Sequence, residues 1–327
     1  MALRLRNPDR QTSVLFSGRK KRCAARIAAL FKLRLSACSV QQPVKRFIAA
    51  KIVWSLSTTL SASEKTPNMS SFIQKEQKGK VLDIRLNRPD KFNSFVRQMA
   101  LDLQAALAEA QENEECRAVR IIGSGKAFCA GQDLVEATDP KGPDLSKIVS
   151  EHYNPIITAM RKLEVPIVCA VNGVAAGAGA NIALAGDIVV AARSASFIQA
   201  FSMIGLIPDS GGTYTLPRLI GFQKASALMM LGDKVSAEEA ERMGMIYKVL
   251  EDEQLEEESL ILAHRLSEMP TLGLALTKAA LNESAQNDLN DQLALEDRLQ
   301  TQAGHSQDYK EGTAAFLEKR KPQFSGK

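Results

Sequence analysis

The sequence predicts an α/β fold followed by a helical region, and three observations support this. A strand pattern over Val81–Leu86 is followed by a helix pattern and then by a second strand pattern over residues 118–122. The almost continuous apolar run Ile167–Val171 is typical of a strand in a sheet that is covered on both faces. After residue 252 the strand patterns stop, and residues 254–320 have the periodicity of successive amphipathic helices. This order indicates an α/β core with helices added at its end.

The first strand and helix follow from two different periodicities. Along the strand, apolar side chains alternate with charged ones: Leu82, Asp83, Ile84, Arg85 and Leu86. A period of two predicts a strand with one buried face and one face in water. In the helix, apolar side chains recur every three or four residues: Val96, Met99, Ala100, Leu103, Ala106, Leu107 and Ala110. Ser94 is predicted to cap this helix, because a serine oxygen can accept a hydrogen bond from an unpaired N–H at a helix start.

The remaining elements have shorter signals. Residues 144–163 are predicted to be helical, and Ile188–Ala192 is predicted to be another strand. A capping box at Ser236 opens a short helix. We expect the helical region at the end of the chain to be interrupted near Pro270 and again over residues 287–290.

Charge divides the chain into two unequal parts. Residues 1–68 hold 14 Lys and Arg against 2 Asp and Glu, whereas residues 69–327 hold 28 against 35 and carry a net charge of −7. The basic segment allows three interpretations: a tail without function that precedes a start at Met69, an organelle transit peptide, or an arm that binds nucleic acid. Its apolar stretch over residues 47–60 is shorter than the ~20 residues that span a bilayer. Of the three interpretations the tail without function is favoured, so we expect no nucleic-acid partner, and the short apolar stretch predicts no membrane partner.

Five cysteines occur, at positions 23, 38, 116, 129 and 169. They form no CxxC pair and have no histidines at metal-ligand spacing, which argues against a zinc site and against a disulfide framework. We therefore predict no metal and a cytoplasmic location, or a mitochondrial one if residues 1–68 are a transit peptide. Cys129 lies in a loop and could be a nucleophile, but no histidine is placed to activate it, so a small buried filler is favoured.

Several glycine-rich segments fail the tests for known loops. A phosphate-binding loop at Gly125 and Lys126 would require Gly five positions before Gly125 and Ser or Thr after Lys126, and the chain lacks both. A dinucleotide fingerprint that begins at Gly177 would require a third glycine where Ile182 stands. No GxSxG motif of a serine hydrolase occurs.

Two loops and one carboxylate remain as candidates for chemistry. Residues 130–131 follow one predicted strand, and residues 177–180 follow another and open a helix. Backbone N–H groups at such positions can hold an anionic oxygen, although close packing of a helix on a strand favours the same small residues. Asp209, in the segment 207–213, could act as a base, but from the residues alone a turn or a helix cap is the favoured explanation. The residues alone leave these alternatives open.

Five ordered motifs resemble the crotonase, or enoyl-CoA hydratase/isomerase, superfamily over residues 72–327. They are AFCAGQD at 127–133, VNGVAAGAG at 171–179, GD at 186–187, PDSGGT at 208–213 and SAEEA at 236–240. The resemblance implies a spiral of repeated ββα units over residues 69–252 and a C-terminal helical region over residues 253–327. It also implies homotrimers that can pair as hexamers.

The resemblance also assigns roles to residues. It places an oxyanion hole for the thioester oxygen on the backbone N–H groups of Ala130 and Ala178, with Asp209 as the catalytic carboxylate. It implies contacts with coenzyme A from Lys126, Ala130, Gly131, Gln132, Asp133, Phe316 and Lys319. Coenzyme A is then part of an acyl-CoA substrate, and no separate cofactor is expected.

Departures from the family pattern indicate the reaction type. Hydratases of the family carry two glutamates, and Asn181 and Phe201 stand at those positions here. We therefore expect an isomerase in which Asp209 moves a proton. Residues 205–213 and 315–327 resemble the branch that converts ring-1,2-epoxyphenylacetyl-CoA to an oxepin thioester in phenylacetate degradation. The alternatives are a Δ3,Δ2-enoyl-CoA isomerase, a hydrolase or dehalogenase with Asp209 as nucleophile, and a nonenzymatic protein that binds CoA or RNA.

The surroundings of Asp209 are expected to tune its acidity. Phe201, Met203 and Ile204 are apolar, and we expect them either to keep the acyl pocket dry or to be ordinary core. A dry pocket would raise the pKa of Asp209 and make it a stronger base.

Overall fold

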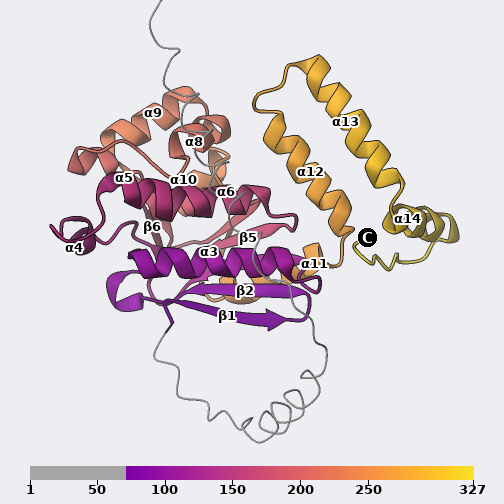
Figure 1. The fold of residues 1–327 in the computed structure, drawn as a ribbon, viewed down its shortest axis with the longest axis horizontal. Coiled ribbons are helices and arrows are strands. Elements are labelled where there is room, and N and C mark those ends of the chain that lie inside the picture. The colour runs from indigo at the N-terminus through magenta and orange to yellow at the C-terminus, as the bar shows by residue number, and fades with distance from the viewer. Residues whose placement is uncertain (1–70) are drawn as a thin grey trace, which may run out of the picture. The chain divides into compact units, whose positions relative to one another are not determined.

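The computed structural model describes residues 71–327 (Figure 1). The chain divides at residue 67 into two units, and the second unit contains all of the described residues. The expectations for residues 1–68, including the transit peptide and the binding arm, lie outside the described part. Each helix among residues 71–327 is too short or too polar to span a lipid bilayer.

The core contains a six-stranded sheet and a four-stranded sheet. The larger sheet has the order β1 (Ile73–Lys78), β2 (Val81–Leu86), β3 (Ala118–Gly123), β5 (Ile167–Val171), β7 (Ile188–Ala192) and β10 (Lys248–Leu250). The smaller sheet has the order β4 (Ala127–Cys129), β6 (Val174–Ala176), β8 (Ser196–Ile198) and β9 (Lys234–Ser236). Neighbouring strands run parallel except for the pairs β1–β2 and β8–β9.

The chain passes repeatedly from the larger sheet to the smaller one. β3 leads to β4, β5 leads to β6, and β7 leads to β8, and helical segments follow each pair of strands. This repetition of strand, strand and helix confirms the predicted α/β spiral of ββα units. The carboxyl ends of β4, β6 and β8 therefore reach the same edge of the smaller sheet.

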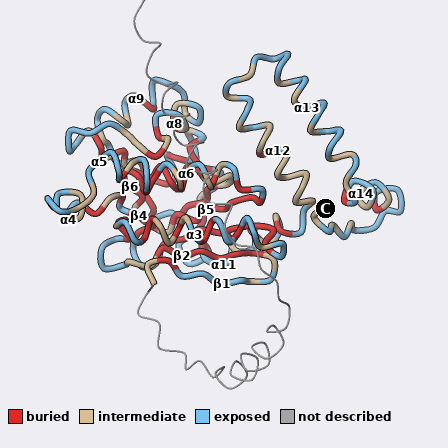
Figure 2. Tube along the Cα trace, in the orientation of Figure 1, coloured by how far each residue is buried: buried red, intermediate tan, exposed pale blue. Residues whose placement is uncertain are grey.

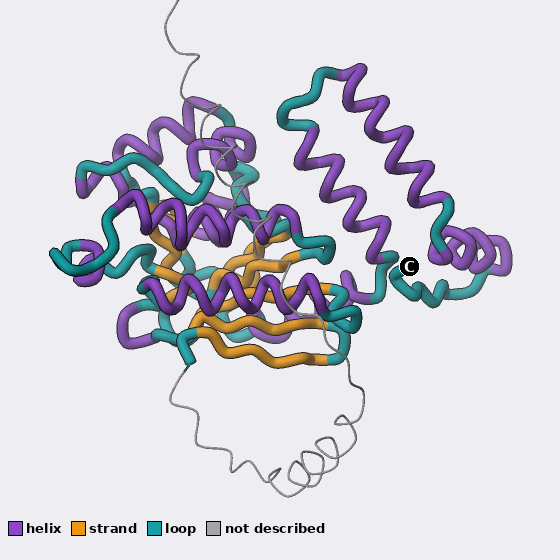
Figure 3. Tube along the Cα trace, in the orientation of Figure 1, coloured by secondary structure: helices purple, strands orange, loops and turns teal. Residues whose placement is uncertain are grey.

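Helices cover the sheets and extend beyond them (Figures 1 and 3). Those within residues 89–242 are η1 (Pro89–Lys91), α3 (Arg97–Glu112), α4 (Leu134–Ala137), α5 (Leu145–Lys147), η2 (Ile148–Tyr153), α6 (Asn154–Lys162), α7 (Ala178–Leu184), η3 (Ala200–Ile204), α8 (Gly212–Ile220), α9 (Phe222–Leu231) and α10 (Ala237–Arg242). The later ones are α11 (Leu255–Ser267), α12 (Thr271–Glu283), α13 (Leu289–Gly304) and α14 (Gln307–Glu318). α11 packs on β3, β5 and β7, so the first helix after residue 252 is part of the core layer. Figure 2 shows buried chain concentrated in the sheets and in the helix faces against them.

Two local predictions about the first strand and helix are wrong. The polar face of β2 is not in water, because Asp83 is 4% exposed and Arg120 of β3 pairs with it through two hydrogen bonds of 2.7 Å. Such bidentate pairing lets a charged side chain remain in the interior. Ser94 does not cap α3, since Val96 is the N-cap residue and the Ser94 hydroxyl accepts a hydrogen bond from Arg88.

The predicted helix over residues 144–163 contains an unexpected π-helical turn. Asp144 caps α5, and the π-helix η2 then connects α5 to α6. The wider turn places two consecutive residues, His152 and Tyr153, inside the protein, where an α-helix would usually turn one of them outward.

Polar contacts attach α12 and the end of the chain to the core. Arg117 donates to the Thr271 hydroxyl and to the Phe324 and Met269 carbonyls. Lys278 of α12, although buried, donates to the Asp187 carboxylate at 2.8 Å. These interactions fix the start and the middle of α12 on the α/β core.

Candidate active site

Three loops meet at the edge of the smaller sheet. Residues 130–133 follow β4, residues 177–178 follow β6, and the segment that ends at Asp209 follows β8. β4 pairs with β6 in parallel, and β6 pairs with β8 in parallel. Because adjacent parallel strands end on the same side, the sheet brings together segments that lie 30 or more residues apart. In open α/β sheets, ligands commonly bind beyond such carboxyl ends.

The first two loops pack closely because glycines occupy the contact. Gly131 has a φ of +89°, and a Cβ at this position would lie 3.0 Å from the Ala176 carbonyl oxygen and 3.5 Å from the Ala178 nitrogen. A Cβ at Gly179 would overlap the Cys129 carbonyl oxygen and lie 2.7 Å from the Cys129 sulfur. The beginning of α7 therefore lies directly against the end of β4.

The structure corrects one of the two predicted oxyanion donors. The Ala130 N–H donates to the Phe92 carbonyl oxygen at 2.9 Å, so it is already paired inside the protein. The Ala178 N–H begins α7, and within residues 71–327 no acceptor pairs with it. On the loop that follows β4, the backbone N–H of Gln132 has no acceptor among residues 71–327. Gln132 and Ala178 are thus the amides available to an anionic oxygen.

Asp209 is held so that one carboxylate oxygen remains accessible. Its backbone carbonyl accepts hydrogen bonds from the Asn181 side chain and from the Gly212 N–H, both at 2.9 Å. The Ser210 hydroxyl donates to Oδ1 at 2.9 Å, and no described side chain donates to Oδ2. Burial raises the pKa of Asp209, and the hydrogen bond from Ser210 offsets part of that rise. The predicted increase in basicity is present in the structure.

Asn181 and Phe201 have structural contacts in place of acid–base roles. The Asn181 side chain donates to the Asp209 carbonyl and accepts from Gln199 at 2.8 Å, so both of its ends are engaged. Phe201 is buried and its ring lies 3.7 Å from where a Cβ on Gly177 would be. Phe201 therefore supplies an apolar wall beside the start of α7.

The expectation that Met203 and Ile204 line a dry pocket or belong to the core is wrong for this chain. These side chains are 72% and 54% exposed. They lie on η3, whose short 3₁₀ turn directs Phe201 inward and the next apolar residues outward.

Tyr153 contacts the loop that follows β4. Its hydroxyl donates to the Gln132 side-chain oxygen at 2.8 Å. Burial raises the pKa of Tyr153 strongly, and the negative charges of the Asp209 and Glu136 carboxylates raise it further. Tyr153 could not be recognised from the sequence, because the π-helical turn that directs it inward leaves no recognisable periodicity.

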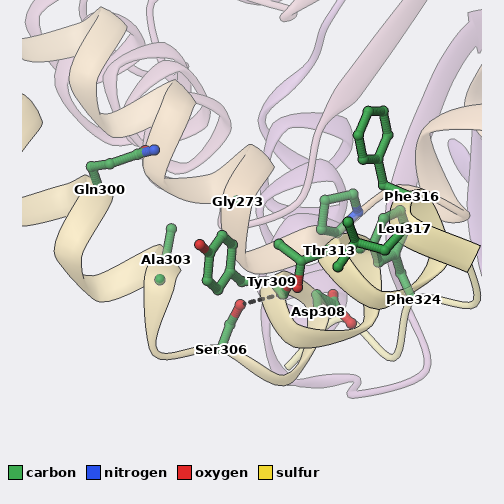
Figure 4. Close-up of a pocket in the computed structure, with 13 residues that line it drawn as sticks. Gly273, Gln300, Ala303, Ser306, Asp308, Tyr309, Thr313, Phe316, Leu317 and Phe324 are labelled. Atoms are coloured by element: carbon green, nitrogen blue, oxygen red, sulfur yellow. Dashed lines mark hydrogen bonds between the residues drawn. The ribbon is translucent and has the colours of Figure 1, made fainter.

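The residues predicted to bind coenzyme A fall into separate groups. Lys126 is exposed near the loop, whereas the Asp133 carboxylate caps α4 and pairs with Arg88 at 2.7 Å. Phe316 and Lys319 lie at the end of α14, which packs against α13. Phe316 lines a hollow of about 640 Å³ formed with α12 and α13 (Figure 4), to which no residue of the three loops contributes. In Figure 1, α14 lies beyond α12 and α13 on the side away from β6, so the end of this helix is remote from the three loops of its own chain.

Cys129 behaves as the buried filler that was favoured. It is fully buried, and burial raises the pKa of its thiol to about 12. A thiol with such a pKa is almost entirely protonated at neutral pH and is a poor nucleophile. Residues 71–327 contain no group of three His, Cys, Asp or Glu side chains that could hold a metal ion.

The spiral fold is shared with known proteins. The chain superposes on an enoyl-CoA hydratase subunit of Geobacillus kaustophilus with a TM-score of 0.74 and 37% identity, covering 79% of this chain and 100% of that one. The 1,2-epoxyphenylacetyl-CoA isomerase of Escherichia coli K12 is 48% identical over 79% of this chain and 100% of its own length. The trans-2-decenoyl-[acyl-carrier-protein] isomerase of Streptococcus mutans is 35% identical over 76% of this chain and 95% of its own length.

The architecture is therefore the crotonase fold. The family model for enoyl-CoA hydratase/isomerase matches residues 76–327. The chain belongs to the enoyl-CoA hydratase/isomerase family and is an enzyme of that family.

Proposed function

We propose that the protein isomerises an acyl-CoA thioester through an enolate and that its substrate is ring-1,2-epoxyphenylacetyl-CoA. The observation that carries the proposal is the arrangement of the site. One desolvated carboxylate with an accessible oxygen, Asp209, shares an edge of the smaller sheet with two unpaired amides, those of Gln132 and Ala178. A base and an oxyanion hole are the groups that proton abstraction next to a carbonyl requires.

The proposed reaction conserves all atoms. Asp209 takes a proton from the carbon next to the thioester, and the carbonyl oxygen becomes an enolate oxygen that accepts hydrogen bonds from Gln132 and Ala178. The bond between the two epoxide carbons breaks while both C–O bonds are kept, which expands the ring to an oxepin. Asp209 then returns its proton to a ring carbon conjugated with the enolate, so the product is an isomer of the substrate. Because no water or electron is consumed, this chemistry requires no cofactor other than the CoA of the substrate.

Hydration is a poorer fit to the site. Adding water to a double bond requires a group that activates the water and a group that delivers a proton. Asn181 is fixed by two hydrogen bonds, and Phe201 is a hydrocarbon. Glu136, the other nearby carboxylate, already accepts hydrogen bonds from the Arg97 N–H and the Gln132 side chain.

A Δ3,Δ2-enoyl-CoA isomerase is the second candidate function. The same base could return its proton two carbons away, and the relative from Streptococcus mutans bears the name of a double-bond isomerase. The epoxide is preferred because the relative with 48% identity is named for it.

The proposal includes binding of coenzyme A by a homotrimer, which can pair as a hexamer. Lys126 is exposed beside the β4 loop. Phe316 is 82% exposed on α14, and Lys319 ends that helix. Since neither residue of α14 reaches the loops of its own chain, they would contact the CoA bound by a neighbouring copy. Exposed apolar residues on α9, such as Phe222 and Met230, are consistent with self-association.

The proposed substrate can be tested directly. We expect the purified full chain to convert ring-1,2-epoxyphenylacetyl-CoA to the oxepin thioester with a higher kcat/KM than it shows for a 3-enoyl-CoA. Product formation would be followed by chromatography and mass spectrometry. A higher kcat/KM for the 3-enoyl-CoA would favour the second candidate, and hydration of a 2-enoyl-CoA as the fastest reaction would refute both.

Ser210 is expected to set the lower pH limit of activity. Asp209 must be ionised to act as a base, so kcat/KM should rise with pH through its pKa. The Ser210 hydroxyl stabilises the ionised form, and its removal should raise the pKa of Asp209 and move the acid limb of the kcat/KM profile to higher pH. Two variants, Ser210→Ala and Ser210→Gly, should show the same shift.

The two variants also separate this effect from backbone strain. Ser210 has a φ of +51°, a conformation that glycine adopts more readily than alanine. We expect Ser210→Gly to have the higher Tm while sharing the altered pH profile. An acid limb that stays in place in both variants would show that Ser210 does not tune Asp209.

A further inference from the structure

Tyr153 occupies a position that the proposed chemistry does not by itself explain. It is the last residue of the π-helix η2, and its side chain is completely buried. Its ring packs against Phe95 with the centroids 6.0 Å apart, and its hydroxyl donates to Gln132 Oε1 at 2.8 Å. The hydrogen bond to Gln132 connects this buried phenol to the loop that follows β4.

The Gln132 side chain is held at both of its ends. Tyr153 donates to its oxygen, and its nitrogen donates to Glu136 Oε2 at 3.0 Å. Glu136 is fixed in turn, because both of its carboxylate oxygens lie 3.0 Å from the Arg97 N–H at the start of α3. The side chain of Gln132 therefore connects two rigid elements, η2 and α3.

The backbone on each side of Gln132 is equally constrained. The Gly131 carbonyl accepts from the Phe95 N–H at 2.7 Å, and the Asp133 N–H donates to the Phe95 carbonyl at 2.8 Å. In this described segment, the Gln132 N–H is left without a partner between two paired neighbours. Since the side chain and both adjacent peptide groups are fixed, the direction of this N–H is fixed as well.

We propose that Tyr153 is a positioning residue that locks Gln132 so that its backbone N–H points at the developing oxyanion. The inference rests on the proposed function, because it assumes a thioester oxygen between Gln132 and Ala178. The π-helical turn supports it, since such turns often occur at functional sites and this one brings Tyr153 inward. An oxyanion donor that is pre-aligned has no reorganisation to undergo during the reaction.

The first test is Tyr153→Phe in the full chain. Phenylalanine keeps the buried ring and removes the hydroxyl. Because the donor is loosened but still present, we expect kcat to fall about 10- to 100-fold with little change in KM. Tyr247→Phe, at a tyrosine that is 66% exposed, is the matched control and should leave kcat unchanged.

A spectroscopic measurement reports on the oxyanion hole without turnover. The thioester C=O stretch of bound phenylacetyl-CoA, which lacks the epoxide, can be followed by infrared difference spectroscopy with a ¹³C label. Hydrogen bonds from the hole should lower this frequency, and Tyr153→Phe should return it toward the value in water. The result would stand even if the enzyme proved inactive on the epoxide, so it separates the positioning role from the choice of substrate.

A double-mutant cycle decides whether Tyr153 acts through Gln132. Gln132→Met keeps the backbone N–H and removes the side-chain acceptor without altering the buried ring. If the proposal is right, Tyr153→Phe combined with Gln132→Met should lose about as much activity as the more damaging single variant. The proposal would be overturned if the fold-losses of activity in the two single variants multiplied in the double variant. It would also be overturned if Tyr153→Phe left the C=O frequency unchanged.

Discussion

Asp209→Asn is expected to lower kcat by about 10³-fold or more while the protein still folds and binds CoA esters. A positioned base contributes about 10²–10⁴-fold to proton transfer, and an amide cannot accept the proton at neutral pH. The variant should keep the loop conformation, because Asn181 and Gly212 bind the backbone carbonyl of residue 209 and not its side chain. Steady-state turnover of the epoxide, together with titration by a CoA ester, measures both effects.

The thermal stability of Asp209→Asn provides a second measurement, and the direction of its change can be predicted. Burial raises the pKa of Asp209 in the folded protein above its ordinary value, so the ionised group is less favourable in the folded state than in the unfolded chain. The free energy of unfolding therefore decreases as pH rises from the pKa of Asp209 in the unfolded chain to its higher pKa in the folded protein. At neutral pH, Asp209→Asn should match or exceed the unmodified protein in Tm.

A matched control is Asp233→Asn, which changes an exposed aspartate between α9 and β9. We expect it to leave kcat and Tm unchanged. Near-normal turnover by Asp209→Asn would remove Asp209 from the mechanism. A covalent adduct on Asp209, detected by mass spectrometry after reaction, would instead identify the carboxylate as a nucleophile.

Gly179→Ala is expected to damage both the fold and the site. The added methyl group would overlap the Cys129 carbonyl oxygen and approach the Cys129 sulfur, so the start of α7 must move away from the end of β4. Overpacking of this kind usually costs about 1–3 kcal/mol of folding free energy. The displacement also separates the Ala178 N–H from the Gln132 N–H, and a misplacement of about 1 Å can cost 10²-fold in rate.

Denaturant unfolding and steady-state kinetics would measure the two effects separately. Gly304→Ala is the control, because a Cβ at Gly304, the last residue of α13, meets no atom within 4 Å. Its stability should equal or slightly exceed that of the unmodified chain, since alanine favours the helix. If Gly179→Ala resembled this control in stability and rate, close contact between β4 and α7 would not be what aligns the two amides.

Much of the core could be predicted from the sequence because its signals are local. β2, β5 and β7 have the predicted bounds, and α12 begins after Pro270 as expected. Ser236 caps α10 by accepting from the Glu239 N–H, as its capping box indicated. In each case, the periodicity of apolar residues or a short capping motif determines the element without help from distant residues.

Predictions failed where distant residues decide the outcome. The polar face of β2 was expected in water, but Arg120 from the next strand neutralises Asp83 and α11 covers that sheet. The Ala130 N–H was expected to be a donor, but Phe92, nearly 40 residues earlier, takes its hydrogen bond. No local pattern could reveal either partner.

Periodicity in the sequence determined the α/β core and the helical region after it, and the ordered motifs, through their resemblance to the crotonase superfamily, implied the spiral and the role of Asp209. Only the tertiary structure decided which amides remain unpaired, how Ser210 and Asn181 hold Asp209, and that Tyr153 reaches Gln132. Those properties depend on hydrogen bonds between segments far apart in the chain. Such bonds form only after parallel strands have brought their ends together, and they leave no signature in the residues next to each group.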